Sequence, residues 1–135
     1  MSSAVSRPIA AESSIAQSHF ESLLQFETDC WDVHHATTNN KKDFVLLDVR
    51  AQILFDQGHL PGSVCLPHSQ MNQRTLEDYS EDTLLVVYCA GPHCNGADKA
   101  ALKLAKLGRP VKKMIGGVTG WIDEGFSLEA AAKHE

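Results

Sequence analysis

The sequence predicts a single α/β domain with a mainly parallel sheet, and three observations favour this fold class. The chain of 135 residues is the size of one compact domain. Apolar residues make up 43% of it and charged residues 21%, as in folded globular proteins. Strand-like segments alternate with helix-like segments, which is typical of α/β domains. We expect a loose arm over residues 1–12 and a single domain over residues 13–135.

Charge, hydropathy and cysteine content exclude several classes of protein. The net charge of −5, with His neutral, argues against nucleic-acid and membrane partners, because phosphate–cation attraction dominates such binding. No apolar run approaches the roughly 20 residues of a membrane span, and the first residues lack the apolar core of a secretory signal. Four cysteines are too few for a disulfide scaffold, so we expect a cytoplasmic protein whose cysteines are catalytic, metal-bound or buried.

Two helices are expected ahead of the first strand. Ser14 and Gln17 have the spacing of a capping box. Apolar residues then recur every three or four positions, which predicts a helix over 15–26 with one stripe hidden against the domain. Asp29 is placed to cap a second helix that ends near Thr37. These helices are expected to cover the core, with dimer contacts as the alternative.

The middle of the chain contains two predicted strands. Residues 44–49 are almost continuously apolar, which fits a strand covered on both faces of a parallel sheet. A short helical piece is expected over 53–55, and a turn over 58–62. Residues 63–66, directly before Pro67, form the second predicted strand.

The second half repeats the alternation. Residues 83–88 are β-branched and unbroken, and they predict the strongest strand of the chain. A loop of small residues follows over 89–96, and then a helix over 97–107, with Gly108 placed to end it. The remaining elements are a strand over 111–115 and short helices over 118–123 and 128–133.

The loop after the strongest strand is the candidate site, because ligands of such sheets bind at the carboxyl ends of strands. Cys89 follows the strand directly, and the helix begins a few residues later. The unpaired N–H groups and positive dipole end of that helix can stabilise a thiolate. We expect a cradle of backbone amides around Cys89, from Ala90, Gly91, His93, Cys94, Asn95 and Gly96. The alternative is an inert, buried Cys89 that merely ends a core strand.

Four parts of the chain, in this order and spacing, carry a resemblance to a known family. They are Leu47-Asp48-Val49-Arg50 with Phe55, Gly58-His59-Leu60-Pro61-Gly62-Ser63-Val64 with Leu66-Pro67, Val86-Val87-Tyr88-Cys89, and Leu107-Gly108 with Val111, Gly116-Gly117 and Trp121. Over about residues 44–126 the sequence resembles the rhodanese-homology domain, a single-domain sulfurtransferase-like family.

The resemblance implies a doubly wound α/β fold, with a mainly parallel five-stranded sheet and helices on both faces. It also implies a sulfurtransferase in which Cys89 takes sulfane sulfur from a small donor, thiosulfate or a persulfide. Cys89 would hold that sulfur as a persulfide and pass it to cyanide or to a thiol, including the thiol of a partner protein. This is nucleophilic covalent catalysis, and it requires no metal or organic cofactor.

The loop departs from the family pattern Cys-x-x-Gly-x-Arg. Gly91 comes one place early and Cys94 stands where Arg is usual, so the loop has no cation to meet the thiosulfate dianion. Cys94 is a second candidate nucleophile, since it also lies near the helix start. It is also a candidate resolving cysteine, because four intervening residues allow a Cys89–Cys94 disulfide if the loop folds back. The alternative is that Cys94 only packs beneath the loop.

Other readings of the same loop are open or disfavoured. Cys89, His93 and Cys94 resemble zinc ligands, but a structural zinc site needs four and no second paired motif exists, so no metal is expected. His93 either tunes the thiolate or is simply exposed to solvent. A phosphatase of the Cys-x5-Arg type is disfavoured, because Asn95 stands where such an enzyme has the Arg that binds phosphate. A binding or regulatory module without turnover, and a thiol-redox protein using both cysteines, are the rival functions.

Six of the 12 basic residues fall in the segment from Lys99 to Lys113, and this segment contains no acidic residue. The simpler interpretation is a solvated surface near a helix C-terminus, where cations are favourable. The alternative is a docking patch for an acidic sulfur donor or acceptor protein.

Overall fold

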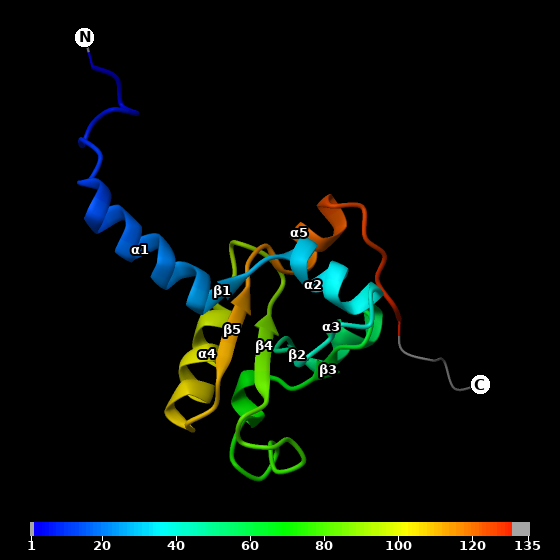
Figure 1. Cartoon of the computed structure of the whole chain (residues 1–135). Helices are drawn as coiled ribbons and strands as arrows, with labels where there is room; N and C mark the ends of the chain where they lie inside the picture. Colours follow the sequence, from blue (N-terminus) through cyan, green and yellow to red (C-terminus); the bar gives the residue numbers. More distant parts are fainter. Residues whose placement is uncertain (1, 131–135) are drawn as a thin grey trace.

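The computed structural model describes residues 2–130 and contains a five-stranded, all-parallel sheet with helices on both faces (Figure 1). The predicted fold class is therefore confirmed. In chain order the elements are α1 (Ser13–Phe26), β1 (Glu27–Thr28), α2 (Cys30–Thr38), β2 (Phe44–Asp48), α3 (Gln52–Gln57), β3 (Val64–Cys65), the 3₁₀ turn η1 (His68–Gln70), β4 (Leu84–Tyr88), α4 (Gly96–Lys106), β5 (Val111–Met114) and α5 (Gly117–Asp123).

The sheet order is β1-β5-β4-β2-β3, which places the strongest predicted strand, β4, at the centre. Along β4, side chains alternate between the two faces, as strand geometry requires. Val87 and Cys89 pack on the face covered by α4. Val86 and Tyr88 pack on the opposite face, together with Val33 of α2 and residues of α5. Each face thus has its own apolar core, and the chain changes from strand to loop at Cys89.

The sequence does not predict strand β1. Glu27 and Thr28 pair with Lys113 and Met114 of β5, which adds a fifth strand at the edge of the sheet. Two residues are too few for an alternation pattern, so β1 exists through its pairing with β5 rather than through local propensity.

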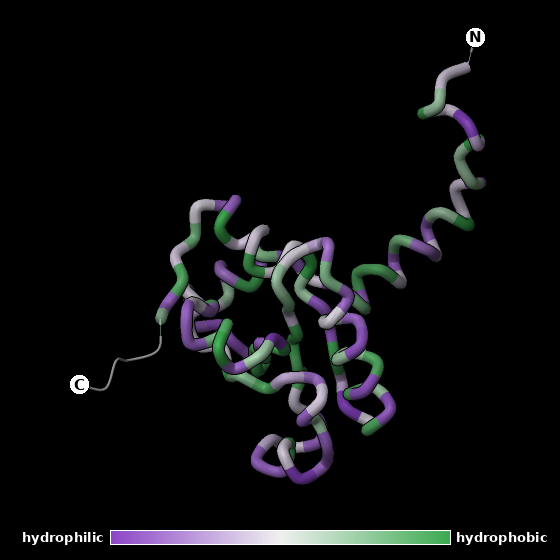
Figure 2. The backbone as a smooth tube through the Cα atoms, turned by 180° about the vertical axis from the view of Figure 1, so that it is seen from behind, coloured by the Kyte–Doolittle hydropathy of each residue, from purple (hydrophilic) through white to green (hydrophobic). Residues whose placement is uncertain are grey.

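The expectation that both early helices cover the core is right for α2 and wrong for α1. Asp29 accepts a hydrogen bond from the Asp32 amide at 2.8 Å and caps α2, which buries Cys30 and Val33. Helix α1 instead stands away from the sheet (Figures 1 and 2), and within residues 2–130 none of its side chains is buried. Its apolar stripe is therefore not hidden by the described part of its own chain.

Two predicted helix details are also wrong. Helix α1 begins after Glu12, and no side-chain hydrogen bond caps it, so Ser14 and Gln17 form no capping box. No helix forms over residues 128–130, because Glu129 pairs with His59 in an antiparallel bridge. The rest of that predicted helix, residues 131–133, lies outside the described residues. No helix within residues 2–130 combines the length and apolarity that crossing a bilayer requires.

Candidate functional site

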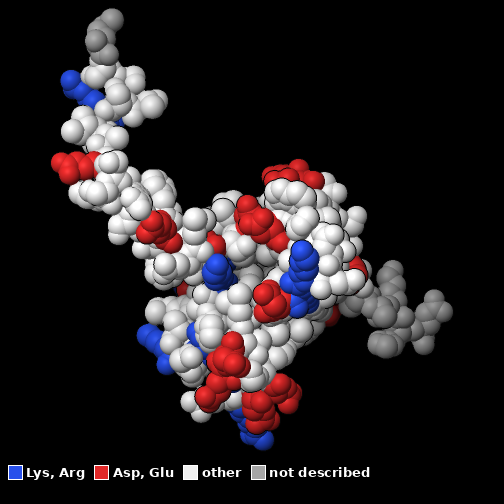
Figure 3. Space-filling model, viewed as in Figure 1, with Lys and Arg blue, Asp and Glu red and all other residues white. Residues whose placement is uncertain are grey.

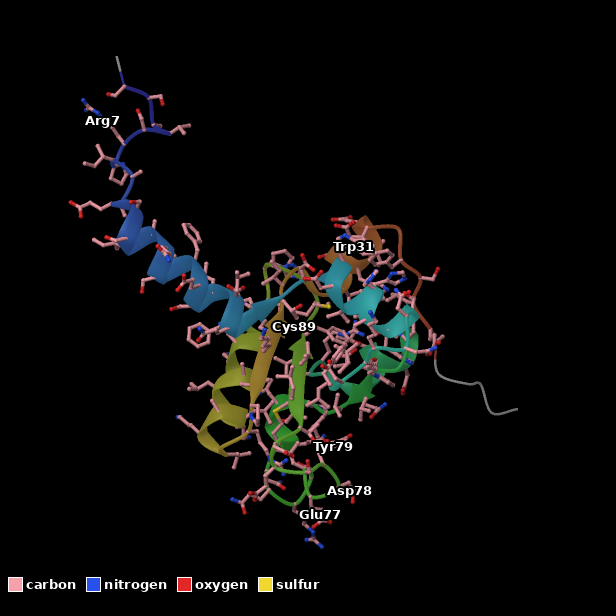
Figure 4. All side chains as sticks on the ribbon, in the orientation of Figure 1. Arg7, Trp31, Glu77, Asp78, Tyr79 and Cys89 are labelled. Carbon is pink, nitrogen blue, oxygen red and sulfur yellow. A yellow bond between two sulfur atoms is a disulfide. The ribbon has the colours of Figure 1, made fainter. Side chains whose placement is uncertain are left out.

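Cys89 lies at the carboxyl end of β4, where the central strand ends (Figure 4). The acidic loop that contains Glu77 and Asp78 lies at the opposite end of the sheet in the same view. The Cys89 side chain is 7% exposed, but it lines a cavity of about 220 Å³ together with Gly91, Pro92 and Cys94. Cys89 is therefore not sealed in the core, although most of its surface is covered.

The sulfur of Cys89 sits against the first residue of α4. A Cβ atom added to Gly96 would lie 2.9 Å from the Cys89 Sγ and 3.3 Å from the Cys94 Sγ. The absence of a side chain at Gly96 is what lets both sulfurs approach the N-terminal end of this 11-residue helix. The unpaired N–H groups and dipole of α4 are therefore positioned to stabilise negative charge on sulfur.

The structure joins Cys89 and Cys94 in a disulfide, with their Cα atoms 6.5 Å apart. The loop folds back through a hydrogen bond from the Cys94 amide to the Gly91 carbonyl oxygen at 3.0 Å. The Gly96 amide donates to the Cys94 Sγ at 3.4 Å. The sequence proposed this pair from spacing alone, and the fold brings the two sulfurs into contact.

The predicted cradle residues do not all take the same part. Gly91 and Cys94 line the cavity with Cys89, whereas the exposed His93 ring lies beside Gly91. The Ala90 carbonyl oxygen accepts from the Thr119 amide at 3.0 Å, and within residues 2–130 the Ala90 amide donates to no protein acceptor. Within residues 2–130, the amides of Gly91, His93 and Asn95 donate to no protein acceptor, so they stay available for a ligand.

Helix α5 fixes the back of the loop. The Val118 amide donates to the Cys89 carbonyl oxygen at 3.1 Å. Gly117 has φ +59°, and a Cβ there would come within 2.5 Å of the Cys89 carbonyl oxygen and 2.7 Å of the Gly91 nitrogen. A side chain at position 117 would therefore push the loop off α5, and glycine also tolerates the left-handed backbone conformation.

Charged residues that the sequence analysis did not assign to the site line the same cavity. Lys113 of β5 and Asp98 of α4 are paired at 2.9 Å, and Glu27 of β1 lies 3.7 Å from the Lys113 Nζ. The hydrogen bond to Asp98, together with the charges of Asp98 and Glu27, raises the pKa of Lys113 despite partial burial. Pairing of β1 with β5 and packing of β5 beside α4 bring Glu27 and Lys113 to the site, so no local sequence signal could have found these two. Asp98 instead lies in the first turn of α4, close to Cys89 in the sequence.

A buried polar network lies beneath the site and holds the strand ends together. The Tyr88 hydroxyl donates to Asp48 Oδ2 at 2.8 Å and accepts from the Leu60 amide at 3.1 Å. Arg50 donates to the same carboxylate at 2.7 Å and to the Gly58 carbonyl oxygen at 2.6 Å. Burial and the Asp48 charge raise the pKa of Tyr88, so its hydroxyl stays protonated and able to donate. Asp48 and Arg50 thus serve to hold the fold together at the strand ends.

Their surroundings make the other two cysteines, Cys30 and Cys65, poor nucleophiles. Burial, with the nearby charges of Asp29 and Glu124, raises the pKa of Cys30 to about 11. Burial and the charges of Asp48 and Asp56 raise the pKa of Cys65. A raised pKa reduces the thiolate fraction, which is the reactive form. Within residues 2–130, no group of three or more His, Cys, Asp or Glu side chains converges as a metal site.

Most of the clustered basic residues serve contacts within the chain. Lys103 donates to the His68 carbonyl oxygen, Arg109 to three carbonyl oxygens of the 76–80 segment, and Lys112 to the Leu24 carbonyl oxygen. With Lys113 paired to Asp98, four of the six basic residues make contacts within the chain, and the docking patch stays a prediction.

The chain is similar to several known proteins. The rhodanese-like domain family model matches residues 33–124. The HTH-type transcriptional regulator Rv0324 of Mycobacterium tuberculosis is 32% identical over 90 residues, which cover 67% of this chain and 39% of the regulator. The adenylyltransferase and sulfurtransferase UBA4 of Yarrowia lipolytica is 34% identical over 87 residues, covering 62% of this chain and 22% of that protein. The chain thus spans less than half the length of these two relatives.

Solved structures share the fold. The BH2092 protein of Bacillus halodurans superposes with a TM-score of 0.85 and 33% identity, covering 88% of this chain and 87% of that one. The thiosulfate sulfurtransferase of Pseudomonas aeruginosa has a TM-score of 0.67 and 22% identity, covering 88% of this chain and 22% of that one. At 22% identity this second likeness shows the fold alone.

Proposed function

Because the chain belongs to the rhodanese-like domain family, we propose that it carries sulfane sulfur as a persulfide on Cys89 and passes it to a thiol or cyanide acceptor. The observation that carries the proposal is the position of the Cys89 Sγ against Gly96, at the N-terminal end of α4 and on the wall of a cavity. Negative charge on a thiolate or persulfide is stabilised there by N–H groups and the helix dipole.

The first half-reaction is transfer of one sulfur atom to Cys89. The Cys89 thiolate attacks the sulfane sulfur of the donor, the sulfur–sulfur bond of the donor breaks, and the remainder leaves as an anion. In the second half-reaction an acceptor nucleophile attacks the outer sulfur and regenerates the thiolate. The donor and the acceptor must each reach Cys89 in turn, and the cavity of about 220 Å³ beside Cys89 is large enough for a small donor.

The charge of the cavity favours a low-charge persulfide over thiosulfate as donor. Lys113 is the positive charge on the cavity wall, and Asp98 at 2.9 Å and Glu27 at 3.7 Å neutralise it. Among the residues that the structure describes, no unpaired Lys or Arg lines this cavity, so an entering dianion would meet amide dipoles alone. We place the protein in a reducing, cytoplasmic compartment, where small persulfides and thiols coexist with a reduced Cys89.

The test is sulfur uptake by the reduced protein, measured as intact mass after incubation with a low-molecular-weight persulfide. The Cys94→Ser variant should gain one sulfur atom, and the Cys89→Ser variant should gain none. Subsequent cyanide should remove that atom as thiocyanate. Failure of Cys94→Ser to gain mass with either a persulfide or thiosulfate would refute the proposal and favour a module without turnover.

The Cys89–Cys94 disulfide favours one second candidate, a thiol-redox protein. That function predicts reversible disulfide formation with small oxidants and no sulfur uptake by either single-cysteine variant. The same mass measurement therefore separates the two candidates.

A further inference from the structure

The cysteine pair assigns a chemical role to Cys94 that goes beyond the transfer of sulfur to an outside acceptor. In the structure the Cys94 Sγ contacts the Cys89 Sγ, which is the inner sulfur of any persulfide formed on Cys89. The Gly96 amide, at 3.4 Å from the Cys94 Sγ, stabilises negative charge on that second sulfur. A nucleophile is thus built into the loop within bonding distance of the persulfide carrier.

We infer that Cys94 resolves the Cys89 persulfide and releases its outer sulfur as hydrosulfide. The protein thereby reduces sulfane sulfur, with electrons supplied by an external dithiol. This inference rests on the proposed persulfide chemistry of Cys89. The product is hydrosulfide, and the co-reactant is a dithiol reductant.

The steps balance in atoms and electrons. The Cys94 thiolate attacks the Cys89 Sγ, the bond from that atom to the outer sulfur breaks, and the outer sulfur leaves as HS⁻ with its proton and the bonding electron pair. The Cys89–Cys94 disulfide forms, which is the bond present in the structure. A dithiol then reduces this disulfide by thiol–disulfide exchange, becomes a disulfide itself, and returns two thiols to the loop.

Two features of the fold favour internal resolution. Residues 89 and 94 are joined by a loop held by the Cys94 amide and the Gly91 carbonyl oxygen, so the attacking thiolate is at a high effective concentration. Gly96 provides space for both sulfurs at once, as its missing side chain would touch each of them. An outside acceptor must instead enter through the cavity.

A single-turnover experiment without oxygen tests this inference. The reduced, desalted chain is mixed with one equivalent of a low-molecular-weight persulfide, and hydrosulfide is measured against the donor alone. The parent should release about one hydrosulfide per chain and lose two hydrogens in intact mass. Cys94→Ser should keep the added sulfur and release almost none. Cys65→Ser, which changes a half-buried thiol outside the loop, should behave as the parent.

The outcomes separate this inference from the proposed function. A parent protein that keeps its added sulfur as stably as Cys94→Ser would overturn the resolving role and leave the persulfide function standing. Absence of sulfur uptake in Cys94→Ser would refute both. Hydrosulfide release that is equal in parent and Cys94→Ser would also overturn the role of Cys94.

A different observation, the uncovered face of α1, carries a second inference. We call Ile15, Ala16, Phe20, Leu23 and Phe26 the α1 apolar face, because helical periodicity places them on one side of the helix. Ile15, Phe20 and Phe26 are each about 60% exposed, with 61%, 60% and 62% of their surface accessible. A helix of 14 residues is marginal alone in water, so this face needs a partner.

The helix is held in its outward position rather than loosely attached. Its carboxyl end continues into β1, whose Thr28 carbonyl oxygen accepts from the Ile115 amide at 2.9 Å. Lys112 Nζ donates to the Leu24 carbonyl oxygen at 2.9 Å. Where α1 meets α4, Leu23 and Phe26 line a groove with Leu102, which is 57% exposed. The α1 apolar face thus runs outward from an apolar groove on the body.

The geometry points to a second copy of this chain as the occupant, with the two α1 helices antiparallel. An antiparallel copy brings its amino-terminal end, with Glu12, to the groove of the first copy. In the groove lining, Glu27 and Asp98 are paired with Lys113. The exposed Lys106, one turn after Leu102 on the same side of α4, is the positive charge that Glu12 of the second copy would meet. Acidic side chains are visible along the projecting helix in Figure 3. The same contact repeats twice in a closed twofold dimer.

The expected dimer is of modest affinity. Two aromatic side chains exposed to about 60% supply roughly 200–300 Å² on each copy, against roughly 800 Å² per partner in a standard stable interface. Ile15 and Leu102 add to this area without reaching it. We therefore expect a dimer that dissociates on dilution.

Sedimentation velocity of the full chain over a range of concentrations tests this second inference. The parent should form a dimer at high concentration, and Phe20→Glu should be monomeric throughout. Ser18→Glu is the matched control, since it adds the same charge on the polar side of the same helix and should still dimerise. A parent that stays monomeric, or a dimer that persists in Phe20→Glu, would overturn the inference.

Discussion

Replacing Gly96 with Ala should damage the chemistry of the site while leaving the stability of the fold almost unchanged. Gly96 is the first residue of α4, and its backbone conformation is open to any residue. Ala is the better helix former by about 1 kcal/mol, so the free energy of unfolding should change by no more than about that amount. The added methyl group, however, would lie 2.9 Å from the Cys89 Sγ and 3.3 Å from the Cys94 Sγ.

The size of the effect follows from these two distances. Ordinary contacts between heavy atoms are about 3.5–4.0 Å, so the Cys89 sulfur must move by roughly 0.5–1 Å. A displacement of about 1 Å in a reacting group can cost on the order of 10²-fold in rate. This corresponds to about 2.7 kcal/mol in the barrier. We therefore expect sulfur uptake by Cys89 to slow about 100-fold in Gly96→Ala.

The assay is the rate of sulfur uptake from a low-molecular-weight persulfide, measured in the Cys94→Ser background so that Cys89 alone is observed. Gly108→Ala is the control, because Gly108 has φ +79° and no atom lies within 4 Å of its added Cβ. It should cost about 1–2 kcal/mol of stability and leave sulfur uptake unchanged. If Gly96→Ala takes up sulfur at the parent rate, the Cys89 sulfur does not react at the α4 terminus and the reasoning fails.

Three further predictions concern the surroundings of the loop. Tyr88→Phe removes a buried hydroxyl that bonds Asp48 and Leu60, so urea denaturation should show a loss of about 1–3 kcal/mol, and an unchanged midpoint would contradict it. The pKa of Cys30 rises from 9.0 to about 11 on folding, so the neutral thiol contributes to the free energy of unfolding fully below pH 9.0. That contribution is lost as the pH rises through 11. Cys30→Ala should therefore reduce the loss of stability at alkaline pH, measured by denaturation at a series of pH values. Asp98→Asn removes the nearer of the two carboxylates that neutralise Lys113, so kcat/KM for thiosulfate should rise about fivefold, worth ~1 kcal/mol, with little change for a low-charge persulfide.

The sequence predicts those parts of the molecule whose signals are local. The apolar runs at residues 44–49 and 83–88 correspond to the central strands β2 and β4, and the Ala-rich segment corresponds to α4. The sequence places Cys89 at the end of β4 because a strand over 83–88, a loop of small residues over 89–96 and a helix over 97–107 follow one another directly. Each of these signals depends on side chains that are close in sequence.

The remaining features depend on pairing between distant segments. Lys113 and Asp98 lie 15 residues apart in sequence, and only the packing of β5 beside α4 sets their charges beside Cys89. Strand β1 exists because Glu27 and Thr28 meet β5. The stripe on α1 correctly indicates a face that avoids water, but periodicity does not state which chain covers it.

The alternation of side chains along β4 separates the structural part of the site from the reactive part. Tyr88 points to the face where Asp48 and Arg50 form the buried network, whereas Cys89 points to the face covered by α4. The network fixes where the strand ends, and the helix terminus determines how the sulfur reacts. Changes on the two faces should therefore act on different properties and add independently, because they share no contact. Tyr88→Phe should lower stability without slowing sulfur uptake, Gly96→Ala should do the reverse, and the double variant should show both losses with little coupling. A large coupling between them would mean that the network positions the Cys89 sulfur directly.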